Sequence, residues 1–138
     1  MSQKISIELK NNLRELERLN RVLEEYAKLY HLPSNVLFAI NLALEEIITN
    51  VISYGYRDDD EHNIIIRINF NQGHLNIEVE DDGLPFNPLE APEPDLKKPL
   101  EEREVGGLGI HLVRNLMEGL EYKRLEGKNL LIMKKKTV

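Results

Sequence analysis

The sequence predicts an α+β fold, a two-layer α/β sandwich in which helices cover one face of a mainly antiparallel sheet. Segments of helical and of alternating periodicity follow one another as strand, helix, helix, hairpin, long loop, helix, hairpin. Hairpins next to grouped helices favour this arrangement, because a parallel doubly wound sheet needs regular strand–helix alternation. The 138 residues fit one domain spanning residues 1–138.

The composition is that of an ordinary globular protein, with 41% hydrophobic and 30% charged residues. No run approaches the eighteen or so apolar residues of a membrane span, and the first ten residues lack a secretory pattern. The chain has no cysteine, which excludes disulfides and thiolate chemistry. We therefore expect a cytoplasmic protein that does not enter a membrane.

The net charge of −6 argues against nucleic-acid binding, which needs a basic surface. The one basic cluster, Lys134–Lys136, is interpreted as a solvated strand end. The four histidines are scattered without the spacing of metal ligands, so no histidine metal site is expected; they are His31, His62, His74 and His111.

Alternating residues 5–9 predict the first strand. Apolar residues at helical spacing then predict a helix over residues 13–30; they are Leu13, Leu16, Leu19, Leu23, Tyr26, Ala27 and Tyr30. Pro33 and Ser34 separate it from a second helix, because proline suits a helix start and serine can cap one. The second helix has a buried stripe and ends at Gly55; the stripe is Leu37, Ile40, Leu44, Ile47, Ile48 and Val51.

Residues 63–69 and 75–80 alternate in polarity and are joined by Asn71-Gln72-Gly73, which predicts a hairpin. Residues 86–104 contain four prolines and no clean period, and a connection of that length inside a domain is commonly functional. We interpret residues 86–105 as a lid. A third helix over residues 108–117 and strands over 120–125 and 130–134, with Gly127 at their turn, complete the chain.

Three short segments are candidates for chemistry, and the first lies on the second helix. Glu46 and Asn50 are four residues apart, so their side chains share a helix face. An asparagine oxygen suits Mg²⁺, and a carboxylate one turn earlier can accept a proton from an attacking hydroxyl. Glu45 points well away from Asn50. The alternative for this segment alone is a solvated polar face.

The second segment, around Asp81 and Gly83, follows a predicted strand. The carboxylate at a strand end can accept a hydrogen bond from the exocyclic amine of adenine, and a glycine lets the base approach the backbone. A plain turn is the alternative, since Asp-Asp-Gly is common in turns.

The third segment, Gly106-Gly107-Leu108-Gly109, opens the third helix. Its backbone N–H groups and the helix N-terminus favour phosphate binding. The segment lacks the Lys-Ser/Thr of a P-loop and the preceding parallel strand of a dinucleotide fold. A hinge for the preceding loop is an alternative that is compatible with phosphate binding.

In this order and spacing the segments resemble the N, G1 and G2 boxes of the GHKL ATPases, which have the Bergerat (histidine-kinase-like) fold. Within that superfamily the chain is most similar to the bacterial anti-sigma-factor serine/threonine kinases. The resemblance covers nearly the whole chain and is carried by Leu44–Asn50 followed by Tyr54-Gly55-Tyr56, by Asp81–Phe86, and by Gly106–Met117.

The resemblance implies a role for each matching residue. Glu46 is the expected catalytic base, Asn50 the Mg²⁺ ligand, and Asp81 and Gly83 the adenine contacts. The expected phosphate contacts are Gly106, Gly107, Leu108 and Gly109, with Arg103 as a lid cation. Two positions depart from the pattern: Pro85 replaces a second glycine, and Val105 stands where a basic residue often precedes the G2 glycines. Lys97 and Lys98 are further candidates for the lid cation.

The resemblance implies an ATP- and Mg²⁺-dependent serine/threonine kinase that holds a sigma factor and phosphorylates an antagonist protein in a partner-switching circuit. A homodimer is implied, with the first helix and its Arg14, Glu17, Arg18 and Arg21 as a candidate partner surface. One alternative is a nucleotide-binding regulatory module without significant kinase activity, because phosphoryl transfer depends on charge neutralisation that a missing lid cation would weaken. Another is an interaction domain that binds no nucleotide.

Overall fold

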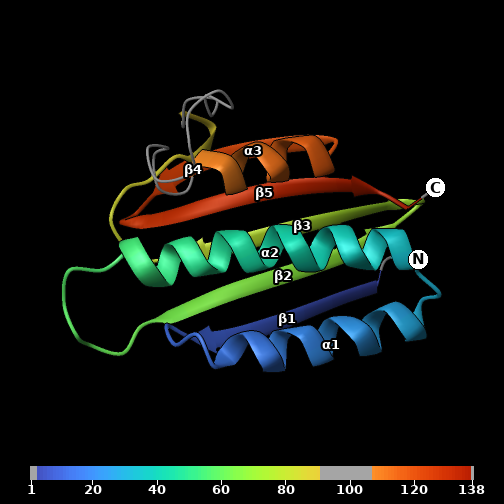
Figure 1. The fold of residues 1–138 in the computed structure, drawn as a ribbon, viewed down its shortest axis with the longest axis horizontal. Coiled ribbons are helices and arrows are strands. Elements are labelled where there is room, and N and C mark those ends of the chain that lie inside the picture. The colour runs from blue at the N-terminus through green and yellow to red at the C-terminus, as the bar shows by residue number, and fades with distance from the viewer. Residues whose placement is uncertain (1–2, 91–106, 138) are drawn as a thin grey trace.

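The computed structural model describes residues 3–90 and 107–137, and within them three α-helices lie over one face of a five-stranded sheet (Figure 1). The strands are β1 (Gln3–Lys10), β2 (Asn63–Asn71), β3 (His74–Asp81), β4 (Gly119–Leu125) and β5 (Lys128–Lys136). The helices are α1 (Glu15–Leu29), α2 (Ser34–Tyr54) and α3 (Gly107–Leu116), with a short 3-10 turn, η1, at Pro88–Glu90. The predicted two-layer sandwich is confirmed.

The strand order is β1-β2-β3-β5-β4, and every neighbouring pair is antiparallel. Both hairpins turn through two residues with positive φ, Gln72-Gly73 and Glu126-Gly127. Two consecutive residues in that region define the turn that matches strand twist, and glycine adopts it without strain. The two hairpins meet where β3 pairs with β5, and Asp81 faces Asn129 in that register.

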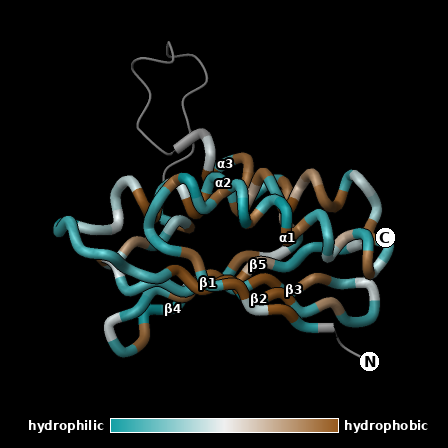
Figure 2. Tube along the Cα trace, turned by 90° about the horizontal axis from the view of Figure 1, so that it is seen from below, coloured by the Kyte–Doolittle hydropathy of each residue, from teal (hydrophilic) through white to brown (hydrophobic). Residues whose placement is uncertain are grey.

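The core lies between the sheet and the helices, where hydrophobic positions of both layers face each other (Figure 2). The central helix α2 supplies its largest fully buried side chains, Ile40, Leu44 and Ile48, against isoleucines of β2 and β3. By length and composition α2 would also suit a membrane span, which the sequence had not led us to expect. In this fold it is the core helix, flanked by α1 and α3 (Figure 1).

Two local expectations were wrong. Ser34 does not cap α2: Pro33 occupies the N-cap position, Ser34 is the first helical residue, and no side chain caps this end. Leu13 lies outside the helix that it was expected to join, and its side chain is 52% exposed. The helix α1 begins two residues later than the sequence pattern indicated, whereas α2 begins one residue earlier than a Ser34 cap would place it.

The basic cluster at the end of β5 is more than a solvated strand end. Lys134 and Lys136 are exposed, but Lys135 is largely covered and donates to the Leu116 carbonyl at 2.8 Å. Leu116 ends α3, so the ammonium group caps the last turn of that helix, where cations are favourable. Lys135 thus ties α3 to the sheet.

Candidate active site

Glu46 and Asn50 lie on one face of the second half of α2, as predicted. Asn50 Nδ2 donates to Glu46 Oε1 at 3.1 Å, and both side chains are partly buried. Glu45, the neighbouring carboxylate, is exposed. The pair therefore faces the interior margin of the helix layer, whereas Glu45 faces solvent.

The start of α3 packs directly on this pair. A Cβ added to Gly109 would lie 1.9 Å from the Glu46 carboxyl carbon and 1.9 Å from its Oε1. No side chain fits at residue 109 unless Glu46 moves. The N-box residues of α2 and the glycine-rich start of α3 are therefore neighbours in space, although 59 residues separate Asn50 from Gly109 in the sequence.

Asp81 ends β3 in a buried position, with 6% of its surface exposed. Its Oδ1 accepts hydrogen bonds from Gly83 N at 2.9 Å and from Asn129 Nδ2 at 3.0 Å. Burial raises the pKa of this carboxyl above its ordinary value, and the two hydrogen bonds oppose that rise. Within the described residues Oδ2 has no protein donor, so an incoming amine has an acceptor there.

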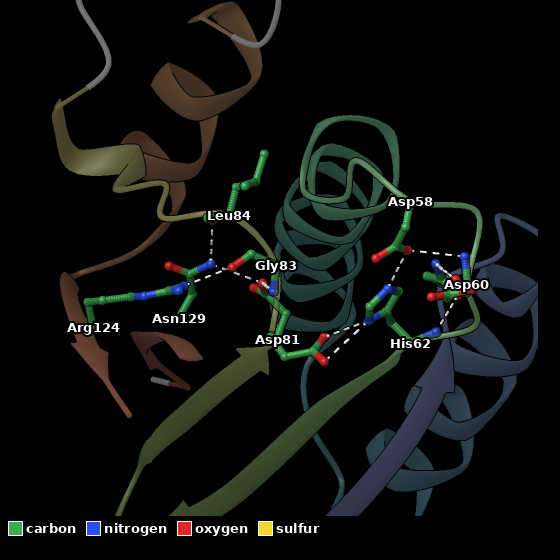
Figure 3. A network of polar contacts seen from close by, with 10 residues as sticks. Asp58, Asp60, His62, Asp81, Gly83, Leu84, Arg124 and Asn129 are labelled. Atoms are coloured by element: carbon green, nitrogen blue, oxygen red, sulfur yellow. Dashed lines mark hydrogen bonds and ion pairs between the residues drawn. The ribbon is translucent and has the colours of Figure 1, made fainter. Parts of the chain in front are cut away.

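Asn129 on β5 is the site residue that sequence reasoning missed. Its Nδ2 also donates to the Leu84 carbonyl at 2.8 Å (Figure 3). Its Oδ1 accepts from the Tyr122 hydroxyl and from Phe86 N, the latter at 3.4 Å. One amide thus joins the end of β3, the following loop and β4. The sequence did carry one signal, the alternation of residues along β5. Asn129 shares the inward face of that strand with Leu131 and Met133, where a polar residue needs hydrogen-bond partners.

The loop that follows β3, residues 82–86, packs against the backbone at the end of α2. Leu84 N donates to the Gly55 carbonyl at 2.7 Å, and a Cβ at Gly83 would lie 2.5 Å from that same oxygen. Arg124 Nη1 holds the Gly83 carbonyl from the other side at 2.8 Å (Figure 3). Glycine at 83 is therefore required by packing between two loops, in addition to any contact with a base.

His62 links the same loop to the segment after α2. Its Nε2 lies 2.7 Å from Asp58 Oδ1, and its Nδ1 lies 3.2 Å from Asp82 Oδ1 (Figure 3). The ring also stacks on Tyr56 with centroids 4.2 Å apart. The hydrogen bonds to Asp58 and Asp82 raise the pKa of His62 and favour the doubly protonated ring.

The predicted site residues thus gather along one half of α2. Gly109 lies at Glu46, and Gly83 and Leu84 lie at Gly55, nine residues further on, or about 14 Å along a helix axis. Gly107 and Leu108 belong to the first turn of α3. Arg103 and Gly106, together with residues 91–105 of the proposed lid, lie outside the described residues, so their roles stay predictions.

The donor set suits a magnesium ion that is held largely by its nucleotide. Asn50 Nδ2 donates its hydrogen bond to Glu46, so the Asn50 Oδ1 atom, a hard oxygen ligand, is available to a cation. No group of three or more acidic, histidine or cysteine side chains able to hold a metal occurs within the part of the chain that the structure describes. Mg²⁺ commonly binds through one or two protein oxygens, phosphates and water, and these residues fit that mode.

The helix-over-sheet architecture and the three gathered segments define a nucleotide-binding ATPase domain of the histidine-kinase type. A family model described as the histidine kinase-like ATPase domain matches residues 9–135, and the chain belongs to that family. An ATPase domain binds ATP, which agrees with the prediction for this chain.

Individual relatives narrow the resemblance to bacterial regulatory kinases. The chain is 33% identical over 98 residues to an anti-sigma F factor of Clostridium perfringens, covering 70% of each. It is 26% identical over 96 residues to the serine/threonine-protein kinase BtrW of Bordetella bronchiseptica, covering 70% of this chain and 68% of the relative. The predicted likeness to anti-sigma kinases is confirmed.

A solved structure shows the same fold. The RsbU and RsbW domains of Rv1364c from Mycobacterium tuberculosis superpose with a TM-score of 0.70 at 14% identity, covering 97% of this chain and 32% of that one. At this identity the likeness concerns the fold alone.

Proposed function

We propose that this protein is an ATP-binding anti-sigma regulator that acts as a serine/threonine kinase on an antagonist protein in a partner-switching circuit. The observation that carries the proposal is the placement of Glu46 and Asn50 against the glycine-rich start of α3, with Asp81 beyond the other end of the same half-helix. The names of the relatives, anti-sigma F factor and serine-protein kinase, support it.

In the proposed reaction, Glu46 accepts the proton of a substrate serine or threonine hydroxyl. The freed oxygen bonds to the γ-phosphorus of ATP, the bond from that phosphorus to the β–γ bridging oxygen breaks, and ADP leaves. Mg²⁺, held through Asn50 Oδ1, would supply charge neutralisation on the phosphates. Asp81 Oδ2 accepts from the adenine amine, and Gly106–Gly109 offer backbone N–H groups to the phosphates.

The proposal extends to partners. A sigma factor and an antagonist bind the protein, which forms a cytoplasmic homodimer, and the single domain 1–138 closes over ATP with the 86–105 segment and Arg103. Arg14 at the N-cap of α1 and Glu17 and Arg21 within the helix are exposed. Arg18 is bound to Glu15 and to the Glu8 carbonyl, so it fastens α1 to β1.

A second candidate is a nucleotide-binding regulatory module without significant turnover. The observation that favours it is Val105, at the position where a cation is often found before the G2 glycines. The two candidates share the pocket and differ only in transfer of the γ-phosphoryl group.

The test is incubation with γ-labelled ATP and Mg²⁺ of the protein captured with its partners from its source cells, beside Glu46→Ala. Label on a partner serine or threonine that Glu46→Ala abolishes supports the kinase. Nucleotide binding without transfer in any partner mixture would leave the regulatory module. Absence of any adenine-nucleotide binding would contradict both candidate functions.

A further inference from the structure

Glu46, Asn50 and Gly109 form one unit, and its geometry assigns Glu46 a second role. We propose that Glu46 is also a positioning residue: it fixes the orientation of the Asn50 amide, and glycine stands at 109 because the Glu46 carboxylate needs that space. This inference rests on the proposed function and names residue roles that the proposed proton transfer does not require.

The first step concerns the amide. An asparagine side chain has one end that accepts and one that donates, and only the oxygen can bind a cation. Asn50 Nδ2 lies 3.1 Å from Glu46 Oε1. A flipped amide would set its oxygen against the carboxylate oxygen, two acceptors without a proton between them. Glu46 therefore holds Asn50 with Oδ1 free for the ion, as outer partners of metal ligands commonly do.

The second step concerns Gly109. The residue lies in the first turn of α3 and does not have a positive φ, so its backbone does not demand glycine. Alanine is the better helix former at such a position. The reason for glycine is spatial, because an added Cβ would approach the Glu46 side chain to 1.9 Å at two atoms and to 2.6 Å at Cγ.

Together these contacts make the ion site depend on α3. A side chain at 109 would displace the Glu46 carboxylate, and a displaced carboxylate would release the Asn50 amide. Because Gly109 has no side chain, it leaves room for the Glu46 carboxylate beside Asn50. This role is separate from any contact between the Gly109 N–H and a phosphate.

The test separates the hydrogen bond from the charge with a matched pair, Glu46→Gln and Glu46→Ala. Both lose the carboxylate, and only Glu46→Gln keeps an acceptor for Asn50 Nδ2. A fluorescent ATP analogue is titrated with Mg²⁺ at fixed protein concentration, and the Mg²⁺ concentration for half-maximal binding is measured. This readout is independent of phosphoryl transfer, which both variants lose.

We expect Glu46→Ala to need about tenfold more Mg²⁺ than Glu46→Gln, the range typical for loss of an outer partner. Gly109→Ala, with Glu46 intact, should also need more Mg²⁺ than the wild type. The fold of every variant is checked without nucleotide by circular dichroism and by its Tm, so that the Mg²⁺ requirement is compared only between folded proteins.

Equal Mg²⁺ requirements for Glu46→Gln and Glu46→Ala would overturn the positioning role while leaving the proposed kinase standing. A wild-type protein that binds the analogue without any response to Mg²⁺ would overturn both. A Gly109→Ala variant with wild-type Mg²⁺ dependence would overturn the spatial role of the glycine.

Discussion

The two ends of the candidate site are built differently. At the proposed adenine end, Asp81 and its loop are held by side chains of β4 and β5 and by the backbone at Gly55. At the proposed phosphate end, among the described residues, a hydrogen bond within α2 joins Glu46 to Asn50, and Gly109 of α3 packs against Glu46. The sheet fixes the first end, whereas the second depends on how one helix lies against another.

This difference separates the part of the site proposed to bind the base from the part proposed to bind the phosphates and the ion. A base can be selected by a rigid edge of the sheet, because its acceptor is already buried and oriented. In the proposed function, the phosphates and the ion are bound by groups from two helices, α2 and α3. Perturbing each end separately should therefore give different losses.

The largest expected effect is at the phosphate end. Asn50→Ala should abolish the Mg²⁺-dependent part of the stabilisation by ATP, since it removes the proposed ion ligand. A ligand bound only by the folded state at a hundredfold excess over Kd contributes about 2.7 kcal/mol. Thermal unfolding with ATP or ADP, each with and without Mg²⁺, measures the loss.

Asn35→Ala, an exposed asparagine in the first turn of α2, is the matched control and should behave as wild type. A Mg²⁺-dependent rise in Tm that survives Asn50→Ala would contradict the assignment of the ion ligand.

At the adenine end, Asn129→Ala should destabilise the protein even without nucleotide, by about 2 kcal/mol. It removes the Asn129 donor from the Leu84 carbonyl and one of the two donors from the buried Asp81 Oδ1, and an unsatisfied buried group costs about 1–3 kcal/mol. Chemical denaturation gives the free energy of unfolding, and binding of adenosine, which lacks phosphates, should weaken in parallel.

Tyr122→Phe is the graded control, since it removes only the hydroxyl that donates to Asn129 Oδ1; we expect a loss of about 1 kcal/mol. If Asn129→Ala left both stability and adenosine binding unchanged, the sheet would not be what holds Asp81 and its loop in place.

The sequence predicted the fold well because its signals are local. Alternating strands, helical stripes and two glycine turns each depend on neighbouring residues, so they survive without tertiary information. The Glu46–Asn50 pair was found for the same reason, since four residues of one helix fix its geometry. The errors at Ser34 and Leu13 concern helix starts, where one residue more or less changes little in the pattern.

The missed features depend on contacts between distant segments. Asn129 reaches Asp81 across 48 residues, and Gly109 reaches Glu46 across 63, so neither contact has a local signal. Gly83 was interpreted through a ligand, while its packing against Gly55 appears only once α2 and β3 are placed. The one hint was the position of Asn129 on the inward face of β5, because a buried polar side chain needs a hydrogen-bond partner.

A smaller effect is expected from Lys135→Met, which removes the cap on α3 but keeps an apolar stem of similar length. The cation at a helix C-terminus contributes about 0.3–1 kcal/mol. We expect Mg·ATP binding to weaken slightly and adenosine binding to stay unchanged, because Lys135 contacts the end of α3 and Glu118 and, among the described residues, makes no hydrogen bond or ion pair with Asp81 or its loop. Calorimetric titration of both ligands checks this. Lys134→Met, at an exposed neighbour, is the control. Equal weakening of both ligands would show that the two ends are not separable.

The smallest effect is expected at the His62 bridge, whose two aspartates are exposed, and the sign of the effect follows from the raised pKa of His62. The hydrogen bonds to Asp58 and Asp82 raise the pKa of folded His62 above the unfolded value of about 6.5. The stabilisation by the bridge is therefore fully present below pH 6.5 and is lost as pH rises through the folded pKa. His62→Gln should flatten the fall in unfolding free energy over that interval, measured by denaturant titration at a series of pH values.

Asp58→Asn tests the same bridge from its other end, because it removes the first cause of the raised His62 pKa. It should move the midpoint of that fall towards pH 6.5 without abolishing it, since Asp82 remains. Glu61→Gln, which loses only the surface ion pair with Lys10, should leave the midpoint in place. A midpoint unchanged in Asp58→Asn would contradict the assignment of the Asp58 hydrogen bond as the main cause of the raised His62 pKa.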